Sequence, residues 1–402
     1  MNKIQEIFTA WNISFNPNDE QAELASKRIE ICNSCEHKKQ NALFKNVCEL
    51  CGCSLSKKVF TPIVGACPDG RWNDIDKAII KNKQMRNLRF VCAQPAVPYY
   101  TWQVEVLINN FIKHGVNPNK IDILCAINNN IVPEDWRKLQ NHYNTVRFFF
   151  YNDTRSDFKY IPAIYFNLMS NHLKAYPELK DEALFLHDSD IVFTRKPELD
   201  WACKTNVWSV SDTKSYINYD YIQQKDNDIY EKMCEIIGID KRIPKLMNSN
   251  SGGAQYIVSG EGWEFWDKVE KDAIAMYDYF CEVEPLYVKK YEGDYPIQKW
   301  TAGMWSLLWN AWLAGHETIV DSRLSFGWVT NPISDVEKHF ILHNAGVTAD
   351  SNSPHCYEKG LFYKGNFINE LPYNKPLKIS DEFASSYYWK EICETAKKTI
   401  LS

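Results

Sequence analysis

Asp188 and Asp190 are the residues whose type and spacing are best suited to chemistry. They follow the apolar run Leu184-Phe-Leu-His187 and precede Ile191-Val-Phe193, with Ser189 between them. The run predicts a buried strand that ends in a tight turn carrying both carboxylates. Mn²⁺ and Mg²⁺ prefer oxygen ligands and bind through one or two carboxylates plus substrate phosphates. The pattern therefore predicts a divalent-metal site, although Asp is also common in ordinary turns.

Six of the 13 cysteines form a second group that could bind metal. They occur as Cys32-x2-Cys35, Cys48-x2-Cys51-Gly-Cys53 and Cys67-Pro-Asp-Gly-Arg-Trp72. Two Cys-x2-Cys pairs at this separation predict a structural Zn²⁺ site, and so small a module has too little core to fold without metal. We expect the ligands to be Cys32, Cys35, Cys48 and Cys51. Either Cys53 or Cys67 could replace one of them, and the alternative is a set of unrelated reduced thiols.

The arrangement of apolar segments indicates several domains. A chain of 402 residues suggests two or three units. We expect a helix and linker over 1–19, a zinc-ribbon-like module over 20–80, an α/β domain over 85–350 and a C-terminal extension over 351–402.

Strands and helices alternate in the α/β segment. Apolar runs predict strands at 88–93, 121–127, 146–151 and 184–187, with helices at 99–113, 133–142 and 161–174 between them. Later segments predict strands at 207–211 and 255–258, and within 340–346 a strand that leads into a turn bearing His343. They also predict helices at 261–279, 301–314 and 385–401. This order implies a Rossmann-like mixed sheet flanked by helices, with ligands beyond the carboxyl ends of its strands. No G-x-G-x-x-G follows the first strand, which disfavours a dinucleotide site.

Composition excludes some classes of protein. The net charge of −5 gives no general basic field for nucleic acid. No apolar stretch reaches the roughly 20 residues needed to span a membrane, and Met1-Asn-Lys-Ile-Gln-Glu does not resemble a signal peptide. We therefore expect a cytoplasmic protein, without a membrane partner, whose cysteines are thiols or metal ligands.

Several segments resemble a metal-dependent glycosyltransferase with the GT-A fold. Tyr99-Tyr-Thr-Trp102-Gln103 looks like the Y-x-x-W-Q segment of hydroxyproline and peptidyl-serine O-galactosyltransferases. Ser251-Gly-Gly-Ala-Gln255-Tyr-Ile-Val258 and Trp300-Thr-Ala-Gly303-Met304-Trp305 look like later blocks of that group. The resemblance is confined to scattered motifs within 88–350. Those relatives often carry an acid where this chain has Gly303, which puts the role of an acid at this position in doubt.

The resemblance implies a nucleotide-sugar donor, such as a UDP-sugar, bound through Mn²⁺ or Mg²⁺. Asp188 and Asp190 match the D-x-D motif, and His343 before Asn-Ala-Gly matches the late histidine that often completes the metal site. A Lewis acid there would stabilise the charge that grows on the departing diphosphate. Asp294 or Glu292 would be a catalytic base only if the enzyme inverts the anomeric carbon.

Other residues near the expected strand ends are candidates for binding the donor. They are Gln94, Arg155, Asp157, Lys159, Tyr160, Ser189, Asn250, Gly252, Gly253 and Gln255. Arg155 and Lys159 also fit a solvated helix start, and paired glycines fit any tight turn. Four tryptophans at near-helical spacing are more typical of core than of a sugar platform. They are Trp300, Trp305, Trp309 and Trp312.

The acceptor is the least constrained part of this interpretation. The cysteine module looks like modules found in bacteriophage proteins, so we favour a hydroxymethylated pyrimidine in DNA, modified in the host cytoplasm. The transferred sugar could be a hexose or a pentose. The even charge of residues 20–76 argues mildly against tight DNA binding. A protein or glycan hydroxyl is the alternative, and a non-catalytic, zinc-dependent interaction protein is an alternative of another class, with Gly303 in its support.

Overall fold

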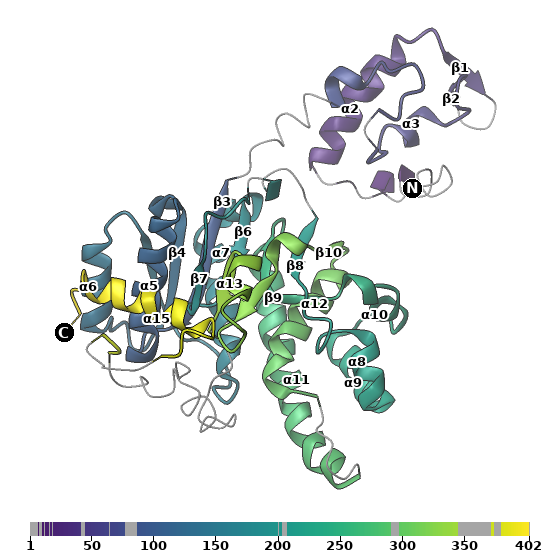
Figure 1. Ribbon diagram of the computed structural model, residues 1–402. Helices are drawn as coiled ribbons and strands as arrows, with labels where there is room; N and C mark the ends of the chain where they lie inside the picture. Colours follow the sequence, from purple (N-terminus) through teal and green to yellow (C-terminus); the bar gives the residue numbers. More distant parts are fainter. Residues whose placement is uncertain are drawn as a thin grey trace. The chain divides into compact units, whose positions relative to one another are not determined.

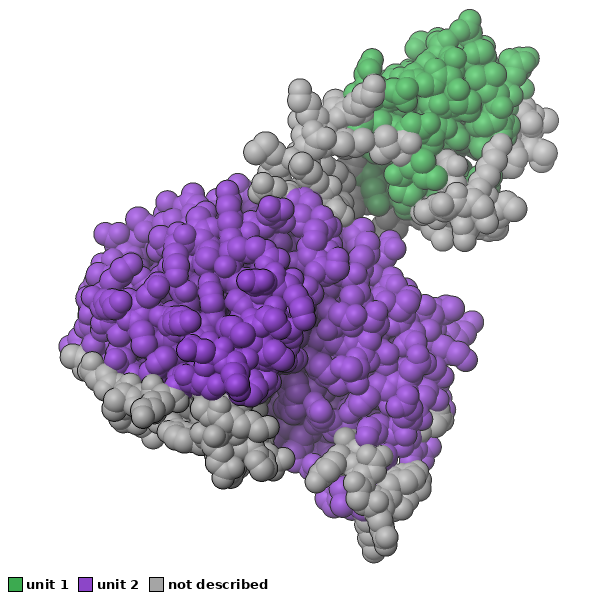
Figure 2. Space-filling view, in the orientation of Figure 1, with its two compact units in different colours: residues 1–85 green, residues 86–402 purple. Residues whose placement is uncertain are grey.

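The chain forms two compact units, residues 1–85 and 86–402, which Figure 2 colours separately. The computed structural model describes residues 7, 10–11, 13–15, 17, 19–41, 45–63, 65–76, 87–199, 201–202, 207–290, 297–344, 371–373 and 379–401. Within these ranges, no helix combines the length and apolarity that crossing a membrane requires.

In its described part, unit 1 combines short helices with one β-hairpin. Its elements are α2 (Asp19–Asn33), β1 (Lys38–Asn41), β2 (Lys45–Cys48) and α3 (Leu55–Lys58). The two strands pair antiparallel, with Lys38 opposite Cys48. The buried apolar core of unit 1 is small, and it consists of Ala25, Cys32, Leu55, Val59 and Trp72.

Unit 2 contains a seven-stranded sheet with the order β10-β8-β9-β6-β3-β4-β5. The strands are β3 (Leu88–Pro95), β4 (Ile121–Ile127), β5 (Arg147–Asn152), β6 (Ala183–Leu186), β8 (Trp208–Ser211), β9 (Gly253–Val258) and β10 (Thr318–Val320). Only β9 runs against its neighbours β6 and β8. The predicted α/β class, a mixed sheet flanked by helices, is therefore confirmed.

Helices cover both faces of this sheet (Figure 1). The α-helices are α5 (Pro98–Lys113), α6 (Glu134–His142), α7 (Ile164–Ala175), α8 (Tyr219–Lys225), α9 (Asn227–Ile237), α10 (Arg242–Leu246), α11 (Trp263–Lys290), α12 (Ala302–Leu313), α13 (Asp335–Lys338) and α15 (Ser385–Ala396). Single 3₁₀ turns are η1 (Pro118–Lys120), η2 (Ile161–Ala163), η3 (Pro177–Asp181), η5 (Asn248–Asn250), η6 (Lys299–Thr301) and η7 (Ser322–Leu324). The helices α7, α11 and α12 pack in one core and α5 and α6 in the other, because alternate side chains of the strands point to opposite faces.

A second, three-stranded sheet lies at the carboxyl end of β6. It has the order β11-β12-β7, from β11 (Phe326–Trp328), β12 (Ile341–His343) and β7 (Ile191–Phe193). Strand β12 runs parallel to β11 and antiparallel to β7. The chain thus leaves the large sheet at Leu186 and enters the small sheet at Ile191, with the acidic turn in between.

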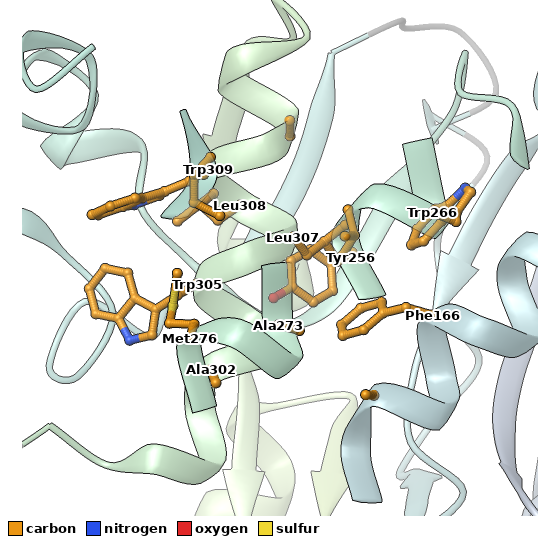
Figure 3. Packing of buried hydrophobic residues seen from close by; sticks show 14 of the residues in the cluster. Phe166, Tyr256, Trp266, Ala273, Met276, Ala302, Trp305, Leu307, Leu308 and Trp309 are labelled. Atoms are coloured by element: carbon orange, nitrogen blue, oxygen red, sulfur yellow. The ribbon is translucent and has the colours of Figure 1, made fainter. Parts of the chain in front are cut away.

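Aromatic side chains of α12 are buried in the core that this helix shares with α11 and α9 (Figure 3). Trp305 and Trp309 are buried there, together with Trp266 and Phe166. The prediction that the tryptophans of this segment belong to the core is correct for Trp305, Trp309 and Trp312. It is wrong for Trp300, which is 53% exposed, because its backbone forms a 3₁₀ turn before the helix begins.

Gly303 permits the close packing of α12 on α7. A Cβ atom at this position would lie 2.7 Å from Cε2 of Phe166 and 3.1 Å from the Tyr160 hydroxyl. We expect Gly303→Ala to lower the free energy of unfolding by about 1–3 kcal/mol, measured by denaturant unfolding, because a packed ring cannot move aside. Adding Phe166→Leu should restore part of the loss.

A matched control for this prediction is Gly262→Ala. The added methyl group would meet only the far end of the Glu264 side chain, at 3.1 Å. Gly262→Ala should therefore change stability by much less than Gly303→Ala. Equal effects at the two positions would contradict the packing argument.

Candidate functional site

The pairing of β7 with β12 brings together three residues that lie far apart in the sequence. His343, the last residue of β12, is opposite Ile191, the first residue of β7. The amide of Asn344 donates a hydrogen bond of 3.0 Å to the carbonyl oxygen of Asp190. His343 therefore lies directly beside the turn that carries Asp188 and Asp190.

The three side chains have the geometry of a metal-ligand set. Nε2 of His343 lies 3.3 Å from Oδ2 of Asp188 and 3.2 Å from Oδ1 of Asp190. All three ligand atoms lie within 4.8 Å of one another. Ligands at right angles around an ion, each ~2.2 Å from it, are roughly 3.1 Å apart. Two carboxylates and one imidazole therefore fit a single Mn²⁺ or Mg²⁺ ion.

Burial differs among the three ligands. The side chains of Asp190 and His343 are 6% and 4% exposed, whereas that of Asp188 is 54% exposed. Two of the three ligands are consequently held in the protein interior, and solvent can reach the third, Asp188. An ion held there would keep coordination positions for further oxygen ligands.

Opposed effects set the pKa of His343. Burial alone would lower it, but the negative charge of Asp190 and the contacts with both carboxylates raise the pKa of His343 to about 9. The neighbouring His187 has no such compensation, so burial lowers its pKa to about 4. In the metal-free protein near neutral pH, His343 is therefore charged and His187 is neutral.

Gln255 and Trp328 both contact the imidazole ring of His343. Nε2 of Gln255 lies 3.5 Å from Nδ1 of His343, and the Ser211 hydroxyl donates to Oε1 of Gln255 at 2.9 Å. The indole of Trp328 stacks on the His343 ring with centroids 5.4 Å apart. A metal bound to Nε2 leaves the proton on Nδ1, and a rotated Gln255 amide would accept it. Gln255 is thus placed to support a metal ligand.

A cavity of about 370 Å³ opens beside this set. It is lined by Ala93, Gln94, Pro95, Tyr99, Tyr100, Gln103, Tyr160, Ile161, Pro162, Ile164, Tyr165, Phe166, Leu186, His187, Asp188, Ser189, Asp190, Tyr216, Ala254, Tyr256, Trp300, Gly303, Met304, Leu307, Trp328 and His343. The three segments that carry the family resemblance each contribute to this lining. The lining is rich in Tyr, Phe and Trp, and its only carboxylates among the described residues are those of Asp188 and Asp190.

Several buried polar atoms on the cavity side chains have no hydrogen-bond partner among the described residues. Oε1 of Gln94 and Nε2 of Gln103 are two of them. The amide of Gln94 donates from Nε2 to the Leu124 carbonyl, and Oε1 of Gln103 accepts from the Ser189 hydroxyl. Unpaired buried polar atoms are costly, so a polar ligand in this cavity would compensate for them.

The backbone is strained where β9 begins beside the cavity. Ala254 has a φ of +68°, a left-handed conformation that is unfavourable for a residue with a Cβ atom. The pairing register between β8 and β9 shifts at Ser211, and a Cβ atom on Gly252 would lie 2.3 Å from the Ser211 carbonyl oxygen. Gly252 therefore permits the close approach of the two strands, whereas a Cβ atom on Gly253 would lie 2.5 Å from the Tyr256 hydroxyl.

The other donor-binding candidates are distributed unevenly. Tyr160 lines the cavity, and its hydroxyl donates to the Trp300 carbonyl at 2.7 Å and accepts from the Gly303 amide at 2.8 Å. Arg155 is committed elsewhere, to Asp153 and to the carbonyl oxygens of residues 160 and 161.

The remaining candidates lie at the surface or outside the described residues. Asp157 accepts a hydrogen bond from the amide of Lys159, and the Lys159 side chain is 75% exposed. Asn250 accepts from Thr318 through its backbone carbonyl in η5. Glu292 and Asp294, the candidate bases, lie outside the described residues.

Sequence reasoning missed several aromatic residues of the cavity. Tyr216 and Tyr165 line it, and Trp328 stacks on the proposed ligand. Trp328 belongs to a strand of only three residues, which has no recognisable periodicity. The high content of aromatic residues in the chain was the only feature of the sequence that indicated these cavity residues.

The cysteines of unit 1 surround a separate, small cavity. Cys32, Cys35, Cys48 and Cys67 line it, whereas Cys51 and Cys53 do not. The structure therefore groups Cys67, rather than the expected Cys51, with the other three.

Comparisons with known proteins give distant matches to solved structures. No family model and no curated protein matches the chain. The apo structure of the WbbM bifunctional glycosyltransferase matches 79% of this chain with 11% identity and a TM-score of 0.40, and this match spans only about half, 52%, of the WbbM chain. Mouse xyloside xylosyltransferase 1, also in its apo form, matches 65% of this chain and 97% of its own, with 9% identity and a TM-score of 0.32.

The raised pKa of His343 predicts a pH-dependent contribution to stability. Because its pKa of about 9 in the folded state lies above the ordinary value of ~6.5, the contribution is full below pH ~6.5 and is lost as the pH rises through about 9. In EDTA, wild type and His343→Gln should therefore differ most in free energy of unfolding near pH 6. The difference should shrink by on the order of 1–3 kcal/mol by pH 9.5, measured by denaturant unfolding. A difference independent of pH would contradict the ion-pair assignment.

The contact between Gln255 and His343 predicts a role in metal affinity. Gln255→Leu should weaken Mn²⁺ binding roughly 10–100-fold, measured by calorimetry, because it removes the partner of the imidazole. The matched control is Gln94→Leu, which changes another buried glutamine of the site without touching a ligand. It should leave Mn²⁺ affinity unchanged, and equal losses in both variants would argue against a specific role for Gln255.

Proposed function

We propose that this protein is a metal-dependent glycosyltransferase of the GT-A type, which moves a sugar from a nucleotide-sugar donor to a hydroxyl group. The observation that carries the proposal is the convergence of Asp188, Asp190 and His343 at the open end of an aromatic cavity. A dinucleotide enzyme would need a phosphate-binding glycine loop after β3, and Gln94-Pro-Ala-Val-Pro98 does not supply one.

The proposed ligands would act on the leaving group. When bound, Mn²⁺ or Mg²⁺ supplies Lewis-acid stabilisation of the diphosphate as the bond to the sugar breaks. Asp190 and His343 are buried and fixed by the pairing of β7 with β12, so they hold their positions without reorganisation. The exposed Asp188 completes the set on the side from which the donor enters.

The cavity also has groups suited to the rest of the donor. Oε1 of Gln94 has no hydrogen-bond partner in the described part of the chain and could accept a hydrogen bond from an N–H of a uracil ring. Tyr100 and Tyr165 line the same cavity and offer apolar faces. These features support a UDP-sugar donor, whose sugar could be a hexose or a pentose.

A catalytic base is the least defined part of the mechanism. Among the described residues that line the cavity, the carboxylates are those of Asp188 and Asp190, which the metal would occupy. Gly303 has no room for an acidic side chain, since even a Cβ atom there would lie 2.7 Å from the Phe166 ring. We therefore retain Asp294 as the proposed base of an inverting reaction, and a retaining reaction would not require it.

The exposed indole of Trp300 is the feature that bears on the acceptor. It is 53% exposed at the edge of the cavity, with its ring centroid 6.0 Å from that of Tyr216. Aromatic platforms of this kind stack on unpaired nucleobases. We accordingly keep a hydroxymethylated pyrimidine in DNA as the favoured acceptor, with a protein or glycan hydroxyl as the alternative.

The test is transfer from radiolabelled UDP-sugars to hydroxymethylated DNA, with serine- and hydroxyproline-containing peptides as parallel acceptors. We expect turnover in Mn²⁺ or Mg²⁺ and none in EDTA. Transfer to peptide but not to DNA would support the glycosyltransferase and overturn the DNA acceptor. Donor hydrolysis without an acceptor would still separate an enzyme from a silent scaffold.

Substitution of the buried ligand should abolish turnover. Asp190→Ala should slow it on the order of a thousandfold, because several kcal/mol of stabilisation of the departing diphosphate are lost. Asp188→Ala should behave similarly, and His343→Ala should retain some activity, since water can replace one ligand. The control is Asp381→Ala, whose side chain is 89% exposed and does not line the cavity, and which should keep wild-type turnover. Full activity of Asp190→Ala in EDTA would contradict the metal-dependent mechanism, whereas no turnover by wild type with any donor or acceptor would favour the non-catalytic, zinc-dependent interaction protein.

A further inference from the structure

The geometry points to a structural zinc site in unit 1 whose four ligands are the thiolates of Cys32, Cys35, Cys48 and Cys67. These residues line one small cavity of about 20 Å³, room for roughly one water-sized sphere. The spacing of the cysteines alone favours Cys51 as the fourth ligand. The fold brings Cys67 to this cavity instead, although Cys67 lies outside both Cys-x2-Cys pairs.

The first three thiols are brought together by local structure. Cys32 lies at the end of α2, and the amide of Cys35 donates back to the Cys32 carbonyl at 3.3 Å. The amide of Lys38 then donates to the Cys35 carbonyl at 3.1 Å, which leads the chain into β1. Because Lys38 pairs with Cys48 across the hairpin, the third thiol arrives beside the first two.

Cys67 is held in place by a network that joins its segment to α2. The buried guanidinium of Arg28 on α2 pairs with Asp76 at 2.9 Å and donates to the Val59 and Thr61 carbonyls. The other carboxylate oxygen of Asp76 accepts from the Gly65 amide at 2.9 Å. These bonds fix both sides of the loop that carries Cys67, so that Cys67 faces the end of α2.

The backbone after Cys48 turns Cys51 away from this cavity. The Gly52 amide donates to the Cys48 carbonyl, and the Cys48 amide donates to the Cys53 carbonyl at 3.0 Å. Gly52 has a φ of +71°, which closes the loop tightly. The Cys53 thiol donates to the Cys51 carbonyl at 3.6 Å, and this pair of cysteines therefore forms a separate contact.

The electrostatics of the thiols agree with this grouping. Burial, together with the nearby Cys67, Cys35 and Cys48, raises the pKa of Cys32 to about 11, although a hydrogen bond with Trp72 opposes the shift. A cation among them would reverse this effect, because zinc binds thiolates and releases their protons. In the described part of the chain, no three cysteine Sγ atoms all lie within 4.8 Å of one another, so closing the site requires the thiols to move inward.

A neighbouring acidic group does not compete for this role. The side chains of Glu36, His37 and Asp69 lie close together at the surface, but Arg71 pairs with both carboxylates. His37 also lines the cysteine cavity, with Nε2 3.6 Å from Oδ2 of Asp69. The assignment of four thiolates excludes His37 as a ligand, and four thiolates leave no coordination position for chemistry.

The experiment measures zinc in the full-length chain purified under reducing conditions. Wild type, Cys51→Ser, Cys53→Ser and His37→Ala should each contain about one zinc per chain that survives dialysis. Cys67→Ser should lose zinc or bind it at least tenfold more weakly in a competition titration with a chromogenic chelator. Loss of zinc from Cys51→Ser, retention by Cys67→Ser or absence of zinc from wild type would each overturn the assignment.

Cobalt spectroscopy keeps the proposal testable if Cys67→Ser leaves unit 1 unfolded. Wild-type protein loaded with Co²⁺ should show the charge-transfer absorption of four thiolates, and Cys51→Ser should match it. A three-thiolate spectrum for wild type, or a reduced one for Cys51→Ser, would contradict the ligand set. Mn²⁺ binding by unit 2 should be unchanged in all these variants, which separates this result from the proposed transferase activity.

Discussion

The antiparallel pairing of β12 with β7 is the interaction on which the proposed site depends. Each strand has only three residues, and His343 must stand opposite Ile191 for its imidazole to meet the carboxylates. A shift of one residue would turn the imidazole to the other face of the sheet. So few backbone hydrogen bonds cannot fix the register alone. Buried side chains fix it, since all of β7 and β12 is inaccessible to solvent or nearly so.

Because two carboxylates lie beside the buried imidazole of His343, the site favours binding of a positive charge, either a proton or a metal ion. Asp188 and Asp190 would repel each other if nothing lay between them, and the low dielectric around Asp190 strengthens that repulsion. A proton on Nε2 of His343 relieves it in the metal-free protein. A divalent cation would reduce the repulsion between the carboxylates further. It must displace the proton from Nε2 of His343, so the proton and the cation compete for the same nitrogen atom. The same charges thus contribute to folding without metal and to affinity for it.

The sequence predicts what is local and misses what depends on tertiary pairing. The apolar run before Asp188 is continuous, so both the strand and its turn follow from it. The position of His343 beside that turn depends on a pairing across about 150 residues, and only the family resemblance suggested it. Trp300 continues the spacing of the helix tryptophans, yet the chain there forms a 3₁₀ turn that directs the ring outward.

The same distinction explains the cysteines. A Cys-x2-Cys spacing predicts that both thiols face one ion, provided that the turn between them has the usual form. In this chain the Cys48 amide donates a hydrogen bond to the Cys53 carbonyl, so the turn after Cys48 has a different form. The fourth thiol of the proposed zinc site, that of Cys67, lies in the segment that the Arg28–Asp76 ion pair joins to α2. No spacing rule contains that ion pair, because its partners are 48 residues apart.

Two metals would serve two physical purposes in this chain. Unit 1 buries few apolar side chains, and its buried ion pair gives specificity more than stability, because removing two charges from water is costly. Its folding free energy must come largely from the proposed zinc, so a closed, four-thiolate site is the suitable kind. Unit 2 has two large cores and can form its site before any ion arrives. Three protein ligands, one of them open to solvent, then leave room for an ion to take phosphate oxygens and release them, as a site that turns over must.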